Sequence, residues 1–282
     1  MSALFKVGAA VGGLALTVGG GFYVKTLLGG EVVCIPLTKE ENYFTTYSNN
    51  EIGKIYGDYL VAPFGLATAI ETSTGGGKVE NNENWWEQTY AVFRTDNGKS
   101  SDFKDQVDRA YEHKVAPAQT KTKKALNKVC EEVYKKASTE IEIVTSGIDN
   151  AKSNLREDLF KYCSFLEKEP IKVVEKDYSD AKSYGKLHQG KLISTKDDSN
   201  NFFWKKQNEL FFKDSGDRSG TGATGDAQSI FKKLYVDKNK KDKWDALKEV
   251  CDLAYSKKES DTEDNNAPKL DVFKFCSLKG KE

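Results

Sequence analysis

One helical sequence motif occurs twice in the chain, in nearly the same form. "ALNKVCEEVYKK" occupies residues 125–136, and "ALKEVCDLAYSKK" occupies residues 246–258. An aromatic segment precedes each copy and a second cysteine-containing segment follows it, in the same order. The aligned landmarks are Trp86 with Trp204, Phe93 with Phe211, Cys130 with Cys251, and Cys163 with Cys276. Landmarks that keep their order across unequal gaps are typical of a tandem duplication, so the sequence predicts two similar domains of ordinary domain size.

The repeat divides the chain into three parts. We place an N-terminal segment at residues 1–34, a first repeat domain at 35–167 and a second at 168–282. The predicted fold is mainly α, with an N-terminal transmembrane anchor followed by two tandem, similar small helical domains. Hydrophobic spacing and capping residues predict about four helices in each domain. The expected helices are 85–94, 102–113, 120–139 and 154–166 in the first domain, and 202–212, 227–236, 243–257 and 269–278 in the second.

The N-terminal segment has the composition of a membrane anchor. No charged side chain lies between Lys6 and Lys25. This run is at the short end of what spans a bilayer, and its glycines are common in membrane helices. We therefore expect one uncleaved helix from Val7 to Leu28 that enters the lipid bilayer. The anchoring side chains are Val7, Leu14, Leu16, Val18 and Val24.

Three alternatives for this segment remain open: a cleaved signal peptide, a buried glycine-rich helix, and a lipoprotein modified at Cys34. No clean small-x-small cleavage site follows the apolar run. Cys34 follows Glu31, Val32 and Val33, which is a poor match to a lipidation site. A charged start before an apolar core is the usual layout for export. We therefore expect a single-pass protein of the cell membrane, with residues 35–282 outside the cell.

The cysteines occur as one pair in each repeat, with Cys34 outside both pairs. Helical spacing places the paired cysteines on the apolar stripes of consecutive helices. An oxidising exterior favours disulfides, so we predict that Cys130 pairs with Cys163 and that Cys251 pairs with Cys276. Unpaired core cysteines are one alternative. Metal binding is another, although neither pair has a nearby histidine or a second cysteine pair.

Residues that could support catalysis are scarce. The two histidines, His113 and His188, occupy non-equivalent places in the repeats. The loop "SGTGATGD" lacks the Gly-Lys-Ser/Thr ending of a phosphate-binding loop. Acidic and basic side chains balance at 43 each, so no overall charge favours nucleic acid. Trp85, Trp86 and Trp204 are expected to be core residues more than platforms for a sugar. These observations predict a protein that is not an enzyme, with no cofactor, no metal site and no nucleic-acid partner.

Several of these features together resemble a known group of proteins. The opening "MSxxxKxGAAxGG", the glycine-rich anchor and the order Trp, Val-Cys, Phe-Cys are similar to uncharacterised paralogous surface-protein families of haemotropic mycoplasmas. The resemblance implies a surface-exposed, antigenically variable protein, and it supplies no catalytic residues. We therefore expect an interaction surface or variable antigen whose partners are host surface molecules or antibodies. A secreted or tethered hydrolase and a nutrient-binding surface protein are the alternatives.

Overall fold

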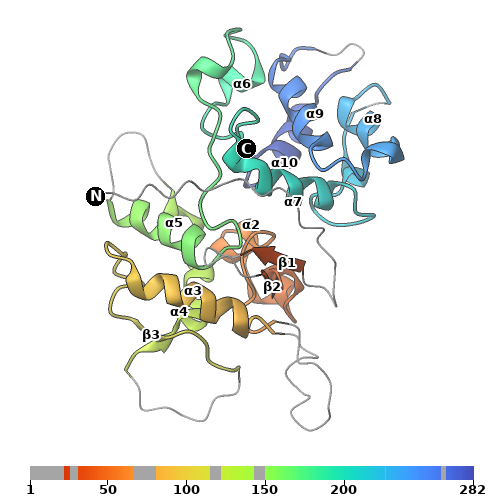
Figure 1. The fold of residues 1–282 in the computed structure, drawn as a ribbon. Helices are drawn as coiled ribbons and strands as arrows, with labels where there is room; N and C mark the ends of the chain where they lie inside the picture. Colours follow the sequence, from red (N-terminus) through yellow and green to blue (C-terminus); the bar gives the residue numbers. More distant parts are fainter. Residues whose placement is uncertain are drawn as a thin grey trace, which may run out of the picture. The chain divides into compact units, whose positions relative to one another are not determined.

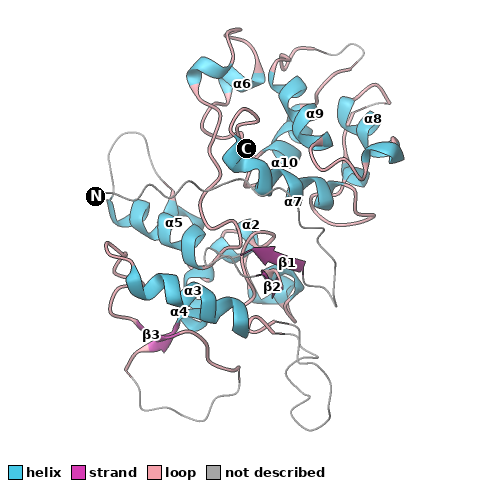
Figure 2. Ribbon diagram, viewed as in Figure 1, coloured by secondary structure: helices cyan, strands magenta, loops and turns pink. Residues whose placement is uncertain are grey.

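The protein consists of two compact units (Figure 1). The structure, a computed structural model, describes residues 22–25, 31–65, 81–114, 122–142, 150–225, 227–261 and 265–282. Residues 1–167 belong to unit 1 and residues 168–282 belong to unit 2. The described residues are mainly helical, with a few short strands (Figure 2). The mainly α fold is therefore confirmed.

Unit 1 combines helices with two small sheets. Its helices are α1 (Tyr43–Thr46), α2 (Ile52–Tyr56), α3 (Glu83–Thr95), α4 (Leu126–Tyr134) and α5 (Asn150–Tyr162), and its 3-10 turns are Leu37–Lys39 and Ser138–Ile141. Strand β1 (Phe22–Lys25) pairs antiparallel with β2 (Glu31–Cys34), and β3 (Val107–Arg109) pairs parallel with β4 (Lys124–Ala125). In the antiparallel pair, Phe22 lies opposite Cys34.

Unit 2 repeats the helical part of this plan. Its helices are α6 (Tyr184–Leu187), α7 (Asn201–Phe211), α8 (Ile230–Val236), α9 (Ala246–Tyr255) and α10 (Lys269–Cys276). Its 3-10 turns are Glu175–Asp177, Asp198–Asn200, Gly220–Gly222 and Lys238–Lys240. Helix α10 follows Pro268, a residue whose fixed φ suits a helix start. Helices α3, α4 and α5 of unit 1 correspond in order to α7, α9 and α10.

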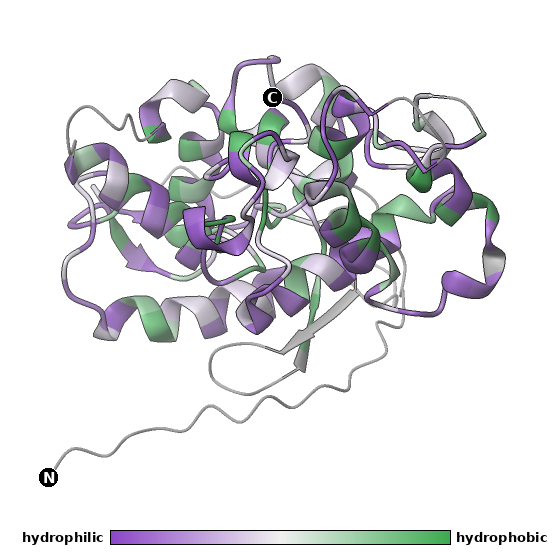
Figure 3. Ribbon diagram, turned by 90° about the horizontal axis from the view of Figure 1, so that it is seen from above, coloured by the Kyte–Doolittle hydropathy of each residue, from purple (hydrophilic) through white to green (hydrophobic). Residues whose placement is uncertain are grey.

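The repeated helices α4 and α9 are amphipathic. In α4, Leu126, Val129, Cys130 and Val133 are all buried, at the spacing of one helix face. In α9, the buried residues include Leu247, Cys251 and Ala254. Hydrophobic and hydrophilic residues share the same helices throughout the ribbon (Figure 3). Each unit therefore has its own hydrophobic core, to which its cysteine-bearing helix contributes one face.

A buried asparagine organises the chain before α3 in unit 1. The Nδ2 of Asn82 donates to the carbonyls of Ile35 and Ala62, at 2.9 and 2.7 Å. Its Oδ1 accepts the backbone N–H of Ile35 at 2.8 Å. Four residues later, the indole of Trp86 also donates to the Ala62 carbonyl, at 3.4 Å. One helix start thus holds two distant segments of backbone in place.

Unit 2 repeats this arrangement with different residues in the backbone segments. Asn200 donates to the carbonyls of Ile171 and Ser194, at 2.8 and 2.9 Å. It accepts the backbone N–H of Ile171 at 2.8 Å. Trp204 donates to the Ser194 carbonyl at 3.1 Å. The two units therefore share hydrogen bonds as well as sequence landmarks, and both tryptophans are core residues.

Each unit contains one disulfide, and the predicted pairing is confirmed. Cys130 is bonded to Cys163 with a Cα–Cα distance of 5.7 Å. Cys251 is bonded to Cys276 with a Cα–Cα distance of 5.8 Å. All four cysteines are fully buried. Cys34, at the end of β2, is also buried and takes part in neither disulfide.

The helix expected over residues 102–113 is wrong. Residues 101–106 form turns, and β3 follows them. Asp105 has a φ of 61°, in the left-handed region that a right-handed helix does not contain. The apolar residue Phe103 is nevertheless buried, as the helical pattern required. The spacing therefore predicted the burial of Phe103 correctly, although it predicted the wrong backbone conformation.

The expected anchor helix is wrong where the structure describes it. Val24 lies in β1, a strand whose partner β2 contains Val32 and Val33. Aromatic and β-branched residues favour this extended pairing. The other anchoring residues, Val7, Leu14, Leu16 and Val18, lie outside the described residues. In the described part of the chain, no helix combines the length and the apolar character that crossing a bilayer requires.

The disulfides should contribute much of each unit's stability. Replacing Cys251 by Ala opens the covalent loop to Cys276, which is worth about 3–4 kcal/mol in the chain-entropy account. We expect the free energy of unfolding of unit 2 to fall by about that amount, with unit 1 unchanged. Urea unfolding followed by hydrogen exchange of peptides from each unit measures this. Equal losses in both units, or a loss in neither, would contradict it.

Asn82 should be among the least replaceable polar residues in unit 1. Substitution by Ala removes three hydrogen bonds and leaves buried backbone groups of Ile35 and Ala62 with fewer partners. We expect a loss of about 3 kcal/mol or more in the free energy of unfolding. Asn84→Ala, at an exposed position of α3, is the matched control and should cost about 0.5 kcal/mol or less. Urea unfolding of both variants tests this, and equal effects would contradict it.

Candidate functional site

A carboxylate directly follows the first disulfide cysteine in each unit. Glu131 follows Cys130 on α4, and Asp252 follows Cys251 on α9. Because the two cysteines occupy equivalent places, so do the two carboxylates. A tyrosine from an earlier part of each unit accompanies them, Tyr47 in unit 1 and Tyr178 in unit 2. These two tyrosines correspond because each ring lies against a glycine of the next short helix, in α2 and α6 respectively.

In unit 2 this carboxylate has a full set of partners. The Oδ1 of Asp252 accepts the hydroxyls of Tyr178 and Thr195, at 2.8 and 2.7 Å. The ammonium of Lys196 lies 2.9 Å from Oδ2. Although partial burial opposes it, the hydrogen bonds from Lys196, Thr195 and Tyr178 hold the pKa of Asp252 below its ordinary value. Asp252 is thus an ionised group that ties α9 to two other segments.

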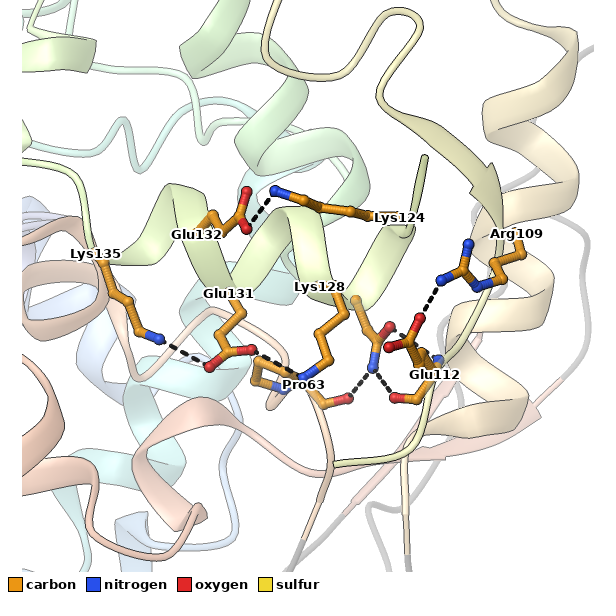
Figure 4. Close-up of polar contacts among 9 residues, drawn as sticks. Pro63, Arg109, Glu112, Lys124, Lys128, Glu131, Glu132 and Lys135 are labelled. Atoms are coloured by element: carbon orange, nitrogen blue, oxygen red, sulfur yellow. Dashed lines mark hydrogen bonds and ion pairs between the residues drawn. The ribbon is translucent and has the colours of Figure 1, made fainter. Parts of the chain in front are cut away.

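In unit 1 the surroundings of the carboxylate are different. Pro63 and Phe64 stand in the places of Thr195 and Lys196, so no hydroxyl or ammonium comes from that segment. Lysines in and directly after α4 pair with Glu131 instead: the Nζ of Lys135 lies 2.8 Å from Oε1 of Glu131, and that of Lys128 lies 3.6 Å from Oε2 (Figure 4). The Lys128 ammonium also lies 4.3 Å above the Phe64 ring.

The remaining polar residues around α4 pair with one another. Lys124 contacts Glu132 at 2.6 Å, and Arg109 contacts Glu112 (Figure 4). The buried Asn127 donates to the carbonyls of Pro63 and Glu112, at 3.0 and 2.9 Å. The Lys124–Glu132 pair is exposed, so it contributes little to stability. The ion pairs leave the outer face of α4 with charges of both signs close together.

A second carboxyl lies near Glu131 in unit 1. Glu40 is half-buried, and its Oε1 is fully enclosed with no hydrogen-bond partner. Burial raises the pKa of Glu40 to about 7, and the charge of Glu131 acts in the same direction. A backbone hydrogen bond from Phe64 and the charges of Lys114 and Lys135 oppose the rise. Glu40 is therefore a carboxyl whose protonation changes near neutral pH.

A buried aspartate near the end of each unit is another repeated feature. In unit 1, Asp158 accepts the backbone N–H and the hydroxyl of Ser100, both at 2.7 Å. In unit 2, Asp271 accepts the backbone N–H and the hydroxyl of Thr224, at 2.8 and 2.9 Å. Burial raises the pKa of both carboxyls above the ordinary value. The hydrogen bonds join the chain segment after α3 to α5 in unit 1, and the chain segment after α7 to α10 in unit 2.

These groups do not form a catalytic or metal-binding arrangement that the two units share. Within the described ranges, no group of three or more His, Cys, Asp or Glu side chains is placed to hold a metal ion. The Nε2 of His188 lies 2.6 Å from Oε1 of Glu259 and forms one exposed pair. In unit 1 the place of His188 is taken by Tyr56. The ring of Tyr56 meets Phe160 edge-on, as the ring of His188 meets Phe273.

Sequence reasoning found the cysteines but missed Asp158, Asp271 and Glu40. The aspartates carried a recognisable signal, because "DLFKYCS" and "DVFKFCS" place each of them five residues before a disulfide cysteine. Glu40 carried none. It has no counterpart in the repeat, and its burial depends on contacts with distant segments. Comparison with known proteins adds no further candidates: no family model, curated protein or solved structure matches this chain.

The buried aspartates should need their acceptor oxygen more than their charge. We expect Asp271→Asn to keep most of the stability of unit 2, because the amide oxygen can still accept from Thr224. Asp271→Ala should lose about 2–3 kcal/mol, because the N–H and hydroxyl of Thr224 lose their acceptor. Chemical unfolding near neutral pH, with hydrogen exchange to identify the unit, compares the two variants. Equal losses would mean that the charge, not the acceptor, matters.

Proposed function

We propose that this chain is a membrane-anchored protein of the cell surface whose two modules serve as an interaction surface or variable antigen, without catalysis. The observation that carries the proposal is the pair of buried disulfides, one in each unit. Disulfides form and persist outside the reducing cytoplasm. The uncharged residues between Lys6 and strand β1 would supply the anchor in the bilayer. Residues 35–282 would then lie outside the cell.

The pattern of change between the repeats supports an interaction surface. Many of the residues that the units share are interior ones: the cysteines, the tryptophans, the asparagines and the aspartates. Some exposed positions differ, as when Glu132 on α4 corresponds to Leu253 on α9, which is 48% exposed. A scaffold that keeps its interior while its exterior changes suits recognition by varied partners. Host surface molecules and antibodies are the partners that this proposal implies.

The resemblance to the paralogous surface families of haemotropic mycoplasmas agrees with this proposal. It rests on the opening motif and on the order of tryptophan and cysteine landmarks. An enzyme would need a site with convergent reactive groups. The polar clusters around Glu131 and Asp252 instead contain carboxylates already paired with lysine. We therefore assign these clusters to the scaffold.

Protease treatment of intact cells that express the full chain tests location and pairing together. We expect external protease to release peptides from both units. Without reductant, the fragments containing Cys130 and Cys163 should stay linked, and so should those containing Cys251 and Cys276. A cytoplasmic protein of the same cells is the control for lysis. Protection of both units until the cells are lysed, or recovery of all four cysteines as thiols, would contradict the proposed function.

A further inference from the structure

Unit 1 contains a segment that is longer than its counterpart in unit 2. Leu37 and Val173 occupy equivalent places, because their N–H groups donate to the carbonyls of Leu60 and Leu192. The next shared landmarks are Tyr47 and Tyr178. Residues 38–46 lie between the landmarks in unit 1, whereas only residues 174–177 do so in unit 2. We call residues 38–46 the insertion segment; it contains Glu40 and helix α1.

Glu40 is half-buried, whereas the other charged residues of the insertion segment, Lys39 and Glu41, are exposed. One of its oxygens, Oε1, is fully enclosed and has no hydrogen-bond partner. Enclosing a carboxylate without a donor for each oxygen is unfavourable, whereas the neutral acid costs much less. The groups that act on Glu40 come from several elements. They are Glu131 and Tyr134 of α4, Lys135 directly after α4, Tyr47 after α1, Tyr111 and Lys114 after β3, and the backbone N–H of Phe64.

The charged groups around Glu40 do not offset the cost of burying its carboxylate. The carboxylate whose charge raises the pKa of Glu40, Glu131, already lies between Lys128 and Lys135. Lys114 makes a contact of 3.9 Å with the neighbouring Glu41. In unit 2, by contrast, the carboxylate of Asp252 receives two hydroxyls and an ammonium. Unit 1 thus has one carboxyl more than its partners can satisfy.

We propose that Glu40 is a proton-operated latch for the insertion segment. The neutral carboxyl keeps residues 38–46 in their folded position, and ionisation releases them. This inference does not depend on the proposed function, since it concerns only how one segment responds to protons. Release would separate the Tyr43 hydroxyl from the carbonyls of Gly53 and Lys54, which accept it at 3.1 and 3.2 Å. It would also move Phe44, an aromatic residue that is 73% exposed.

The direction of the pH effect follows from linkage. The pKa of Glu40 is about 7 in the folded segment and 4.5 ordinarily. The folded segment therefore binds a proton at pH values where the released segment does not. Its stability falls as the pH rises from about 4.5 to about 7, and it levels off above that. The equilibrium for release should increase about tenfold between about pH 6 and about pH 8.

Hydrogen exchange of the full chain measures this release directly. After correction for intrinsic exchange rates, peptides covering 38–47 should lose about tenfold in protection from about pH 6 to about pH 8. Peptides covering 173–178 of unit 2 should not. Glu40→Gln should keep the segment protected across the range. Glu41→Gln changes an exposed neighbour and should behave as the wild type does.

Two results would overturn the latch: protection of residues 38–47 that does not change with pH in the wild type, or a Glu40→Gln variant that retains the wild-type dependence. If that variant does not fold, Glu131→Gln provides the test. Removing the neighbouring charge lowers the pKa of Glu40 in the folded segment, so the loss of protection should level off at a lower pH and should be smaller in total. A pH dependence identical to that of the wild type would overturn the assignment to Glu40.

Discussion

The disulfide between the two cysteine-bearing helices is the constraint on which each unit depends. It joins α4 to the end of α5 in unit 1, and α9 to the end of α10 in unit 2. A tyrosine one helical turn after the first cysteine reinforces the bond. Tyr134 donates its hydroxyl to the carbonyl of Cys163 at 2.8 Å, and Tyr255 donates to that of Cys276 at 2.9 Å. The same hydroxyls also donate to the backbone carbonyls of Val61 and Ile193. In each unit, one tyrosine side chain therefore links the second cysteine to an extended segment.

Buried polar groups define the remaining geometry of the units. The asparagine before α3 and α7 forms hydrogen bonds with two backbone segments at once. The aspartate in α5 and α10 binds the chain segment that follows α3 or α7. Because a buried polar group without a partner is costly, these residues favour one arrangement of the segments they touch. The aromatic contacts follow the same plan. Phe93 meets Tyr162 edge-on at 5.0 Å, and Phe211 meets Phe275 at 4.9 Å.

The units differ mainly where such constraints are absent. Unit 2 has Thr195 and Lys196 beside its carboxylate, whereas unit 1 has Pro63 and Phe64. Unit 1 adds the insertion segment and with it the carboxyl of Glu40. Each unit can keep its core despite these differences, because its disulfide and the hydrogen bonds of the asparagine before α3 or α7 and of the buried aspartate do not involve the residues that differ. The same tolerance would allow exposed positions to diverge in a protein that meets varied partners.

The sequence by itself determined the duplication, the cysteine pairing, the core tryptophans and most of the longer helices. These features depend on local spacing or on residues that occur twice in the same order. Tertiary structure decided the rest. Val107–Arg109 became a strand because its partner at Lys124–Ala125 lies beside it in space, and no helical period reveals that pairing. The pKa of Glu40 depends on burial and on the charge of Glu131, which is distant in sequence. A carboxyl's chemistry is set by what surrounds it in space, and the order of residues along the chain does not contain that information.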